Sequence, residues 1–73
     1  MIPVVDMVKT GLRIHYLRTQ LNISVRDLQS IFNFNTPQAI YKWEQGRSLP
    51  TIDNLVILAK VFNVRLDDII CYG

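Results

Sequence analysis

The hydrophobic residues in the first half of the chain have helical spacing. Between Leu12 and Thr36 there is no proline or glycine, and apolar residues recur at intervals of three and four, which is the period of a helix face and not of a strand. A first helix is therefore predicted over residues 6–21, ended by Asn22. Its inward-facing residues are Ile14, Leu17 and Leu21.

A second helix is predicted over residues 25–33 from signals at both of its ends. Ser24, followed three residues later by Asp27, matches a capping box, in which each side chain binds a backbone N–H of the other residue. Asn33 tolerates the left-handed conformation in which helices commonly end. Its inward-facing residues are Val25, Leu28 and Phe32.

The third helix is predicted over residues 37–45. Thr36 is expected to cap it, and Pro37 suits the first helical position because the N–H that it lacks would have no helical partner there. Gly46 supplies the stop signal. The buried side consists of Ala39, Ile40 and Trp43. The outward side consists of Gln38, Tyr41, Lys42 and Gln45.

Two further helices complete the chain. Thr51 is a cap residue before a helix predicted over residues 51–62. A short last helix is predicted over residues 66–70, although Arg65 is a poor cap residue. The inward stripe of the longer helix is Ile52, Leu55, Leu58, Ala59 and Phe62.

Composition limits how such a domain can be stabilised. The 73 residues suffice for one domain, residues 1–73, and 49% of them are hydrophobic, as in globular proteins. Cys71 is the only cysteine and His15 the only histidine, so neither an internal disulfide nor a zinc site is expected. We expect no cofactor. His15 is interpreted as a surface residue, and Cys71 as a small apolar residue or exposed thiol, with a redox sensor as the alternative.

The chain contains no run of roughly 20 apolar residues that would cross a bilayer, and no signal peptide pattern. We therefore expect a cytoplasmic protein without a membrane partner. Because so small a core benefits from a second subunit, we also expect a homodimer, either on its ligand or through the C-terminal apolar residues Ile69, Ile70 and Tyr72.

The net charge of +2 is small, but its distribution is uneven. Up to Arg47 there are six basic residues and three acidic ones, whereas the remainder has two basic and three acidic residues. An anionic partner would therefore dock on the first two-thirds of the chain. The six basic residues are Lys9, Arg13, Arg18, Arg26, Lys42 and Arg47.

Five stretches in order resemble the lambda-repressor-like, Cro-type helix-turn-helix proteins, also called the XRE family. The resemblance covers residues 11–70 and implies an all-α bundle of about five short helices with a central helix-turn-helix. It also implies a cytoplasmic protein that is associated with the nucleoid when it is bound to DNA. The stretches are Ile14–Arg18 (IHYLR), Asn22–Leu28 (NISVRDL), Gln38–Pro50 (QAIYKWEQGRSLP), Asp53–Phe62 (DNLVILAKVF) and Val64–Ile69 (VRLDDI).

The resemblance implies sequence-specific binding to double-stranded DNA by a small prokaryotic or phage regulator, a repressor in our interpretation. The major groove admits one α-helix, and polar side chains on its outer face can pair with base edges. On the helix over residues 37–45, Gln38 suits adenine and Lys42 suits guanine, and Tyr41 and Gln45 are further candidates for base contacts.

Other residues are assigned to positioning by the same resemblance. Thr36 and Arg47 match residues that lie beside phosphates, and Val25 and Arg26 begin a helix whose positive end faces the DNA backbone. Arg18 and Glu44 match a structural ion pair between the first helix and the recognition helix.

Three features depart from the family pattern. Gln29 occupies a position where the family prefers alanine, and the turn over residues 33–36 is one residue longer than usual. Pro37 stands where many relatives have a base-contacting side chain. These departures, with the modest charge, favour an alternative: a protein-interaction module on the same fold, such as an antitoxin-like or regulator-binding protein with little sequence-specific DNA binding.

An enzyme is not expected, and neither is a small-molecule substrate. The sequence has no glycine-rich phosphate loop and no histidine paired with a serine or cysteine nucleophile. The chain is also too short to enclose a substrate pocket.

Overall fold

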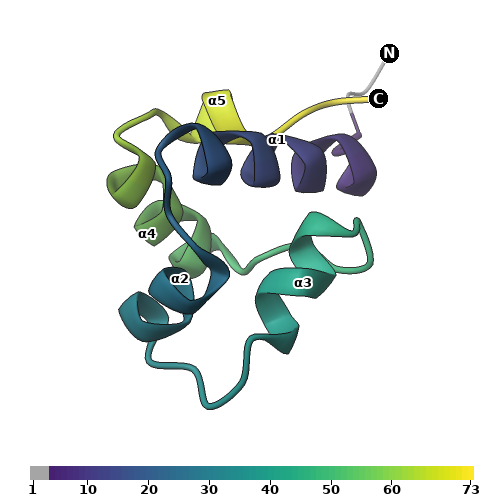
Figure 1. Cartoon of the computed structure of the whole chain (residues 1–73). Coiled ribbons are helices and arrows are strands. Elements are labelled where there is room, and N and C mark those ends of the chain that lie inside the picture. The colour runs from purple at the N-terminus through teal and green to yellow at the C-terminus, as the bar shows by residue number, and fades with distance from the viewer. Residues whose placement is uncertain (1–3) are drawn as a thin grey trace.

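The structure, a computed structural model that describes residues 4–73, is an all-α bundle (Figure 1). The predicted fold class is therefore confirmed, with α2 and α3 forming the central helix-turn-helix. None of the helices in the described part of the chain has the length and apolar character that a membrane span requires. The helices are α1 (Met7–Gln20), α2 (Val25–Phe32), α3 (Gln38–Glu44), α4 (Ile52–Phe62) and α5 (Leu66–Ile69).

Local capping chemistry defines most helix ends. The capping box of α2 is present, since Ser24 Oγ accepts from the Asp27 N–H and Asp27 Oδ2 accepts from the Ser24 N–H, both at 2.9 Å. Thr51 Oγ1 accepts from the Asn54 N–H at 3.2 Å at the start of α4. Such a cap contributes about 1 kcal/mol. Three asparagines with φ of 57° follow α1, α2 and α4, where the left-handed conformation reverses the chain: Asn22, Asn33 and Asn63.

The start of α3 differs from the prediction. The helix begins at Gln38, Pro37 occupies the cap position, and no side chain caps the helix, so Thr36 does not act as the cap residue. The Pro37 carbonyl instead accepts the first helical bond, from the Tyr41 N–H at 3.2 Å. Thr36 lies in the bend before Pro37 with its side chain exposed, which is where proline favours an extended conformation for the preceding residue.

One hydrophobic core is shared by all five helices. Two predicted core residues lie outside it: Leu21 is 49% exposed because α1 has already ended, and Ile52 is 68% exposed because it stands in the first turn of α4. Ile69, in contrast, is fully buried and cannot contribute to a dimer surface. The buried apolar residues are Ile14, Leu28, Ile40, Trp43, Leu55, Leu58, Ala59, Phe62 and Ile69.

The two ends of the described chain lie side by side next to α1 (Figure 1). Val5 and Tyr72 form an antiparallel bridge, and the Asp6 N–H donates to the Cys71 carbonyl at 2.8 Å. Thr10, which is fully buried on α1, accepts the Cys71 N–H at 3.0 Å. These bonds hold the C-terminal segment against α1, on the side of the bundle away from α2 and the tip of the turn.

Candidate nucleic-acid interface

The position of α3 is fixed from behind by a close contact with α1. Gly11 is buried where the two helices meet, and a Cβ atom there would overlap the carbonyl oxygen of Trp43 and lie 3.0 Å from that of Glu44. Only glycine allows the backbones to approach so closely. Gly46 ends α3 with φ of 72°, and a Cβ on Gly46 would lie 2.8 Å from the Val8 Cα. The back of α3 therefore rests on the backbone of α1.

An ion pair links the same two helices. Arg18 Nε donates to Glu44 Oε2 at 2.6 Å and Arg18 Nη2 to Glu44 Oε1 at 3.0 Å, so the guanidinium binds both carboxylate oxygens. Arg18 Nη1 also donates to the Ile23 carbonyl at 2.9 Å, which adds the turn before α2 to the network. The Arg18 and Glu44 side chains are only 11% and 9% exposed. Arg18 and Glu44 thus form the pair that the resemblance implied.

The environment of the pair favours the charged forms. Burial acts to raise the pKa of the Glu44 carboxyl, but hydrogen bonds from Arg18 and His15 outweigh it and hold that pKa below 4.5. The hydrogen bond to Glu44 also raises the pKa of Arg18. Glu44 therefore remains ionised at neutral pH with its charge balanced inside the domain.

His15 is the residue whose contact was not foreseen. Its side chain is 53% exposed, as a surface residue should be, but its Nδ1 lies 2.8 Å from Glu44 Oε1. A histidine protonated at Nδ1 donates this bond. Glu44 is 29 residues away in the chain. No carboxylate stands within one helical turn of His15, so local spacing gives no sign of the contact.

An aromatic cluster holds the long turn between α2 and α3. The rings of Phe32 and Phe34 are stacked with centroids 5.1 Å apart, and both meet Trp43 edge-on at 5.4 and 5.9 Å. Gln29 Nε2 donates to the Phe34 carbonyl at 3.2 Å. Two of the departures from the family pattern are thus connected, because the glutamine at position 29 binds the backbone of the lengthened turn.

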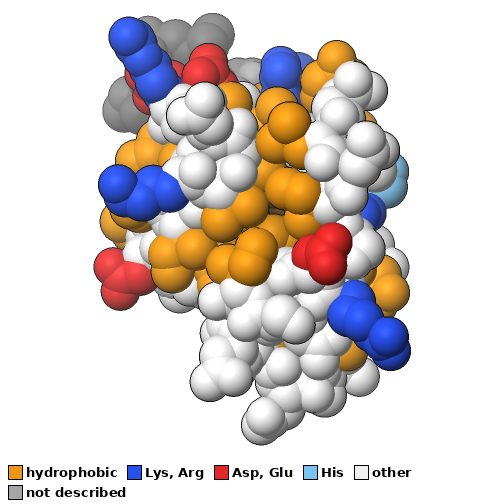
Figure 2. Space-filling model, turned by 60° about the vertical axis from the view of Figure 1, so that its left-hand side comes forward, with side chains coloured by type: hydrophobic (Ala, Val, Ile, Leu, Met, Phe, Trp, Pro, Cys, Tyr) orange, Lys and Arg blue, Asp and Glu red, His pale blue; other side chains and the backbone are white. Residues whose placement is uncertain are grey.

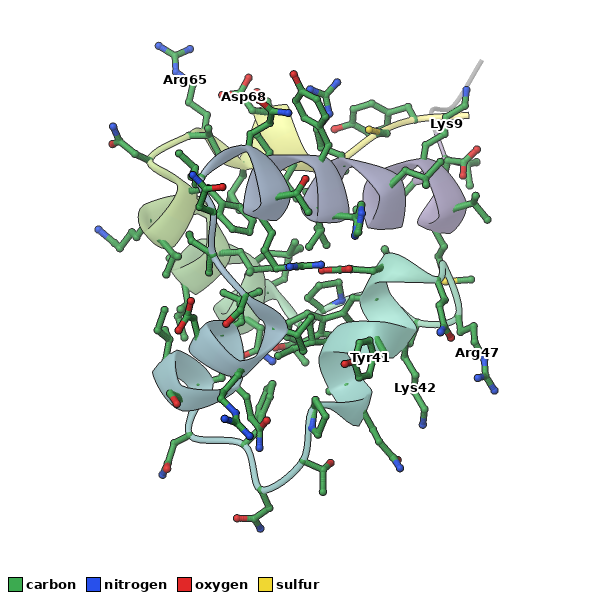
Figure 3. The ribbon with its side chains drawn as sticks, viewed as in Figure 1. Lys9, Tyr41, Lys42, Arg47, Arg65 and Asp68 are labelled. Carbon is green, nitrogen blue, oxygen red and sulfur yellow. The ribbon has the colours of Figure 1, made fainter. Side chains whose placement is uncertain are left out.

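The outer face of α3 presents the predicted base-contacting side chains to solvent. Together with Arg47 from the following loop they surround a shallow open hollow of about 370 Å³. Figure 3 shows Lys42 and Arg47 projecting outward on the same side of the molecule, with Tyr41 beside them on α3. The residues that line the hollow are Gln38, Tyr41, Lys42, Gln45 and Arg47.

The charge of this face is positive. Glu44 is the only acidic residue between Asp27 and Asp53 in the sequence, and it faces inward onto Arg18. Lys42 and Arg47 therefore stand on the outer face without a neighbouring carboxylate from this segment. Such a surface attracts a polyanion through long-range electrostatics.

The remaining predicted phosphate-contacting residues lie apart from that hollow. Arg26 is exposed on the first turn of α2 and lines a second open hollow of about 380 Å³ with Gln29, Ser30, Asn33 and Phe34. Val25 is half-buried against the core, and Thr36 is exposed in the turn. The candidate contacts therefore form one group on α3 and its following loop and another along α2 and the turn.

Known proteins share the fold of this chain. Residues 14–69 of the chain match the model of the helix-turn-helix family. The crystal structure of the restriction-modification controller protein C.AhdI from Aeromonas hydrophila is similar, with a TM-score of 0.77 and 23% identity over 88% of this chain and 96% of that one.

Two structures of the DNA-binding domain of BldD are also similar in fold. The crystal structure matches with a TM-score of 0.75 and 18% identity, covering 90% of this chain and 94% of that chain. The S. venezulae BldD domain has the same TM-score, identity and coverage of this chain, and 97% of its own length is covered. Comparison with curated protein sequences finds no match. The chain belongs to the XRE-type helix-turn-helix family of DNA-binding transcription regulators.

Proposed function

We propose that the protein binds a specific double-stranded DNA sequence and acts as a transcriptional repressor, with α3 in the major groove. The observation that carries this proposal is the contrast between the fixed back of α3 and its exposed polar front. A rigidly held helix with an outward polar face is what direct base recognition requires. Repression needs nothing beyond this binding, because a protein that occupies a promoter excludes other proteins from it.

Gln38 and Lys42 are proposed as the main base-contacting residues. The Gln38 amide can pair with both the N6 and N7 groups of an adenine, and Lys42 can donate to the O6 and N7 acceptors of a guanine. Tyr41 and Gln45 line the same hollow and are proposed as neighbouring contacts. A good pair of this kind contributes about 1 to 3 kcal/mol of discrimination against the wrong base.

Arg47, Arg26, Thr36 and Val25 are proposed to bind phosphates and so to set the register of α3. Arg47 lies at the edge of the hollow, while Arg26 stands in the first turn of α2. Val25 would contribute only its backbone N–H, because its side chain packs against the core. These contacts carry no sequence information by themselves but give the complex its dependence on salt.

The repressor is proposed to bind as a two-fold dimer on a palindromic site. Two copies of α3 would then enter successive major grooves, with half-sites about 34 Å apart, or one helical turn. The exposed C-terminal Tyr72 is one apolar group available to a second copy, but Ile69 is not.

Selection from a random double-stranded DNA library tests the proposal. The enriched oligonucleotide is then titrated against scrambled DNA at two salt concentrations. We expect an enriched palindrome that is bound at least about 10³-fold more tightly than the scramble. No enrichment, with all binding lost at physiological salt, would instead favour the protein-interaction alternative.

Alanine variants separate the proposed roles. Gln38→Ala and Lys42→Ala should relax the base preference at one position each of the selected site, leaving binding to scrambled DNA nearly unchanged. Arg47→Ala should weaken binding to every sequence alike and flatten the slope of affinity against salt concentration. Equal losses for all three variants on every DNA would contradict the assignment.

A further inference from the structure

Helix α4 is apolar on nearly all of its circumference, although it lies at the surface. Only Asp53, Asn54 and Lys60 interrupt its apolar residues. Its inward side supplies four residues to the core: Leu55, Leu58, Ala59 and Phe62. A helix that is hydrophobic all round is usually covered on every side. The sequence of α4 therefore predicts that another protein surface packs against its outer side, and no helix of the described structure does so.

The outer side of α4 carries a regular stripe, Asp53, Val56, Ile57 and Lys60, which we call the α4 stripe. The spacing of these residues at i, i+3, i+4 and i+7 places them along one helix face. Val56 and Ile57 are 39% and 38% exposed, and the charged residues at the two ends are exposed as well. The stripe thus has an apolar centre between one negative and one positive end.

The surface around the α4 stripe has the composition of a protein–protein interface, with an apolar centre and charged residues at its edge. In Figure 2 a broad area of hydrophobic side chains covers the face turned forward from the side of α4, with charged side chains of both signs around it. Within residues 4–73 the only acidic partner found in an ion pair is Glu44, so neither end of the stripe is paired. Asp53 and Lys60 are about 10.5 Å apart along the axis, too far to pair with each other.

We propose that the α4 stripe binds the α4 stripe of a second copy of this chain, with the two helices antiparallel about a two-fold axis between Val56 and Ile57. In that arrangement Asp53 of each copy faces Lys60 of the other. Val56 of each copy meets Ile57 of the other at the centre. Both charges are then neutralised, and the exposed apolar side chains are covered.

The charge pattern selects a second copy over another kind of partner. A two-fold contact requires that if one residue meets another, the reverse contact also forms, so the surface must complement itself. The α4 stripe meets this condition because its charges are opposite in sign and equally distant from its midpoint. A parallel pairing would instead place like charges together. A partner of single charge sign would complement only one end.

This inference deepens the proposed function, because it names the surface through which the proposed dimer forms. The contact uses α4, so it leaves the base-contacting face of α3 free for DNA. Association is measured without DNA, so a failure of DNA binding and a failure of dimerisation are seen in separate experiments.

Sedimentation equilibrium of the full chain over a range of concentrations, with two charge-reversal variants, tests the proposal. Wild type should dimerise reversibly. Asp53→Lys and Lys60→Asp each place like charges opposite one another twice in a homodimer, so each should raise the dissociation constant at least about tenfold. An equimolar mixture of the two variants should restore association as a heterodimer, since every facing pair is then opposite in sign.

The apolar centre has its own test. Ile57→Lys should also raise the dissociation constant at least about tenfold, whereas Leu12→Lys, at the 60% exposed Leu12 of α1, should leave it unchanged. Circular dichroism checks that each variant is folded. If Ile57→Lys does not fold, the mixture of the two charge-reversal variants still tests the proposal. The proposal is overturned if the wild type is monomeric. It is also overturned if either single charge-reversal variant associates as tightly as the wild type, or if the mixture of the two variants stays monomeric.

Discussion

The inner and outer faces of α3 meet opposite requirements within seven residues. On the inner face, Ile40 and Trp43 are buried and Glu44 binds Arg18, while the backbone touches α1 at Gly11. On the outer face, Gln38 and Lys42 are exposed around an open hollow. The inner face fixes the position of the helix in the domain, and the outer face is free to bind a partner.

This contrast separates two kinds of substitution. A change on the inner face should reduce the free energy of unfolding and weaken every activity that depends on the position of α3. A change on the outer face should leave that free energy nearly unchanged and alter only recognition. Effects on the free energy of unfolding should therefore decline from the first prediction below to the last.

Gly11→Ala should have the largest effect. The added Cβ would overlap the Trp43 carbonyl oxygen, which is backbone and cannot rotate away, so α1 and α3 must separate. We expect a loss of about 3 kcal/mol in the free energy of unfolding. Urea denaturation followed by Trp43 fluorescence measures it. The control is Gly73→Ala, whose Cβ would have no neighbour closer than 3.5 Å; equal losses would contradict the contact.

Glu44→Gln should come next, at about 2 kcal/mol near neutral pH. The substitution leaves the guanidinium of Arg18, only 11% exposed, without its counter-charge. The same denaturation measurement applies. Asp67→Asn, at an exposed carboxylate in the first turn of α5 without an ion pair in the described structure, is the control and should cost less than about 1 kcal/mol.

Lowering the pH should also remove the stabilisation from this ion pair, with a smaller loss in the free energy of unfolding than Glu44→Gln causes. The pKa of Glu44 is lower in the folded protein than its ordinary value of 4.5, so the stabilisation is present above pH 4.5 and is lost as the pH falls through the folded pKa. Asp27 contributes in the same direction, because the backbone N–H of Ser24 lowers its pKa. Thermal unfolding between pH 7 and 2.5 should show a shallower decline for Glu44→Gln than for wild type.

Gln29→Ala tests the support of the long turn. It removes the bond to the Phe34 carbonyl and should cost about 1 kcal/mol. Because the turn leads into α3, affinity for the selected DNA should also fall. Gln20→Ala, at an exposed glutamine that ends α1, is the matched control and should change neither quantity. A Gln29→Ala variant indistinguishable from that control would contradict the supporting role.

Lys42→Ala should have the smallest effect on stability, within about 0.5 kcal/mol, because its side chain is exposed on the outer face. The selected DNA site should nevertheless lose its preference at one base pair. Denaturation and competitive titration on the same preparation measure both. A large loss of stability would show that the two faces of α3 are not independent.

The sequence predicted the helices well because their signals are local. The capping box at Ser24 and Asp27 and the left-handed Asn33 act within one turn of chain, and both are present. Prediction failed where a residue lay at the margin of an element: Leu21 and Ile52 have apolar character, but each stands at a helix end and is exposed. Thr36 is not the cap residue of α3 because Pro37 occupies the cap position.

The candidate interface was predictable only in part. The outward side of α3 follows from helical periodicity, and the structure places the four predicted side chains there with Arg47 around one hollow. The contact of His15 with Glu44 was not predictable, because it joins residues 29 positions apart. The role of Gln29 was visible in the sequence only as a departure from the family pattern, and its bond to Phe34 gives the reason.

By itself the sequence determined the number and order of the helices, their main caps, and which side of α3 faces outward, since each depends on neighbours within a few residues. Only the tertiary structure decided how closely α1 and α3 approach, which charges are neutralised inside, and which apolar residues of α4 stay uncovered. These properties depend on distances between segments that are remote in the chain, and packing of the whole domain sets those distances.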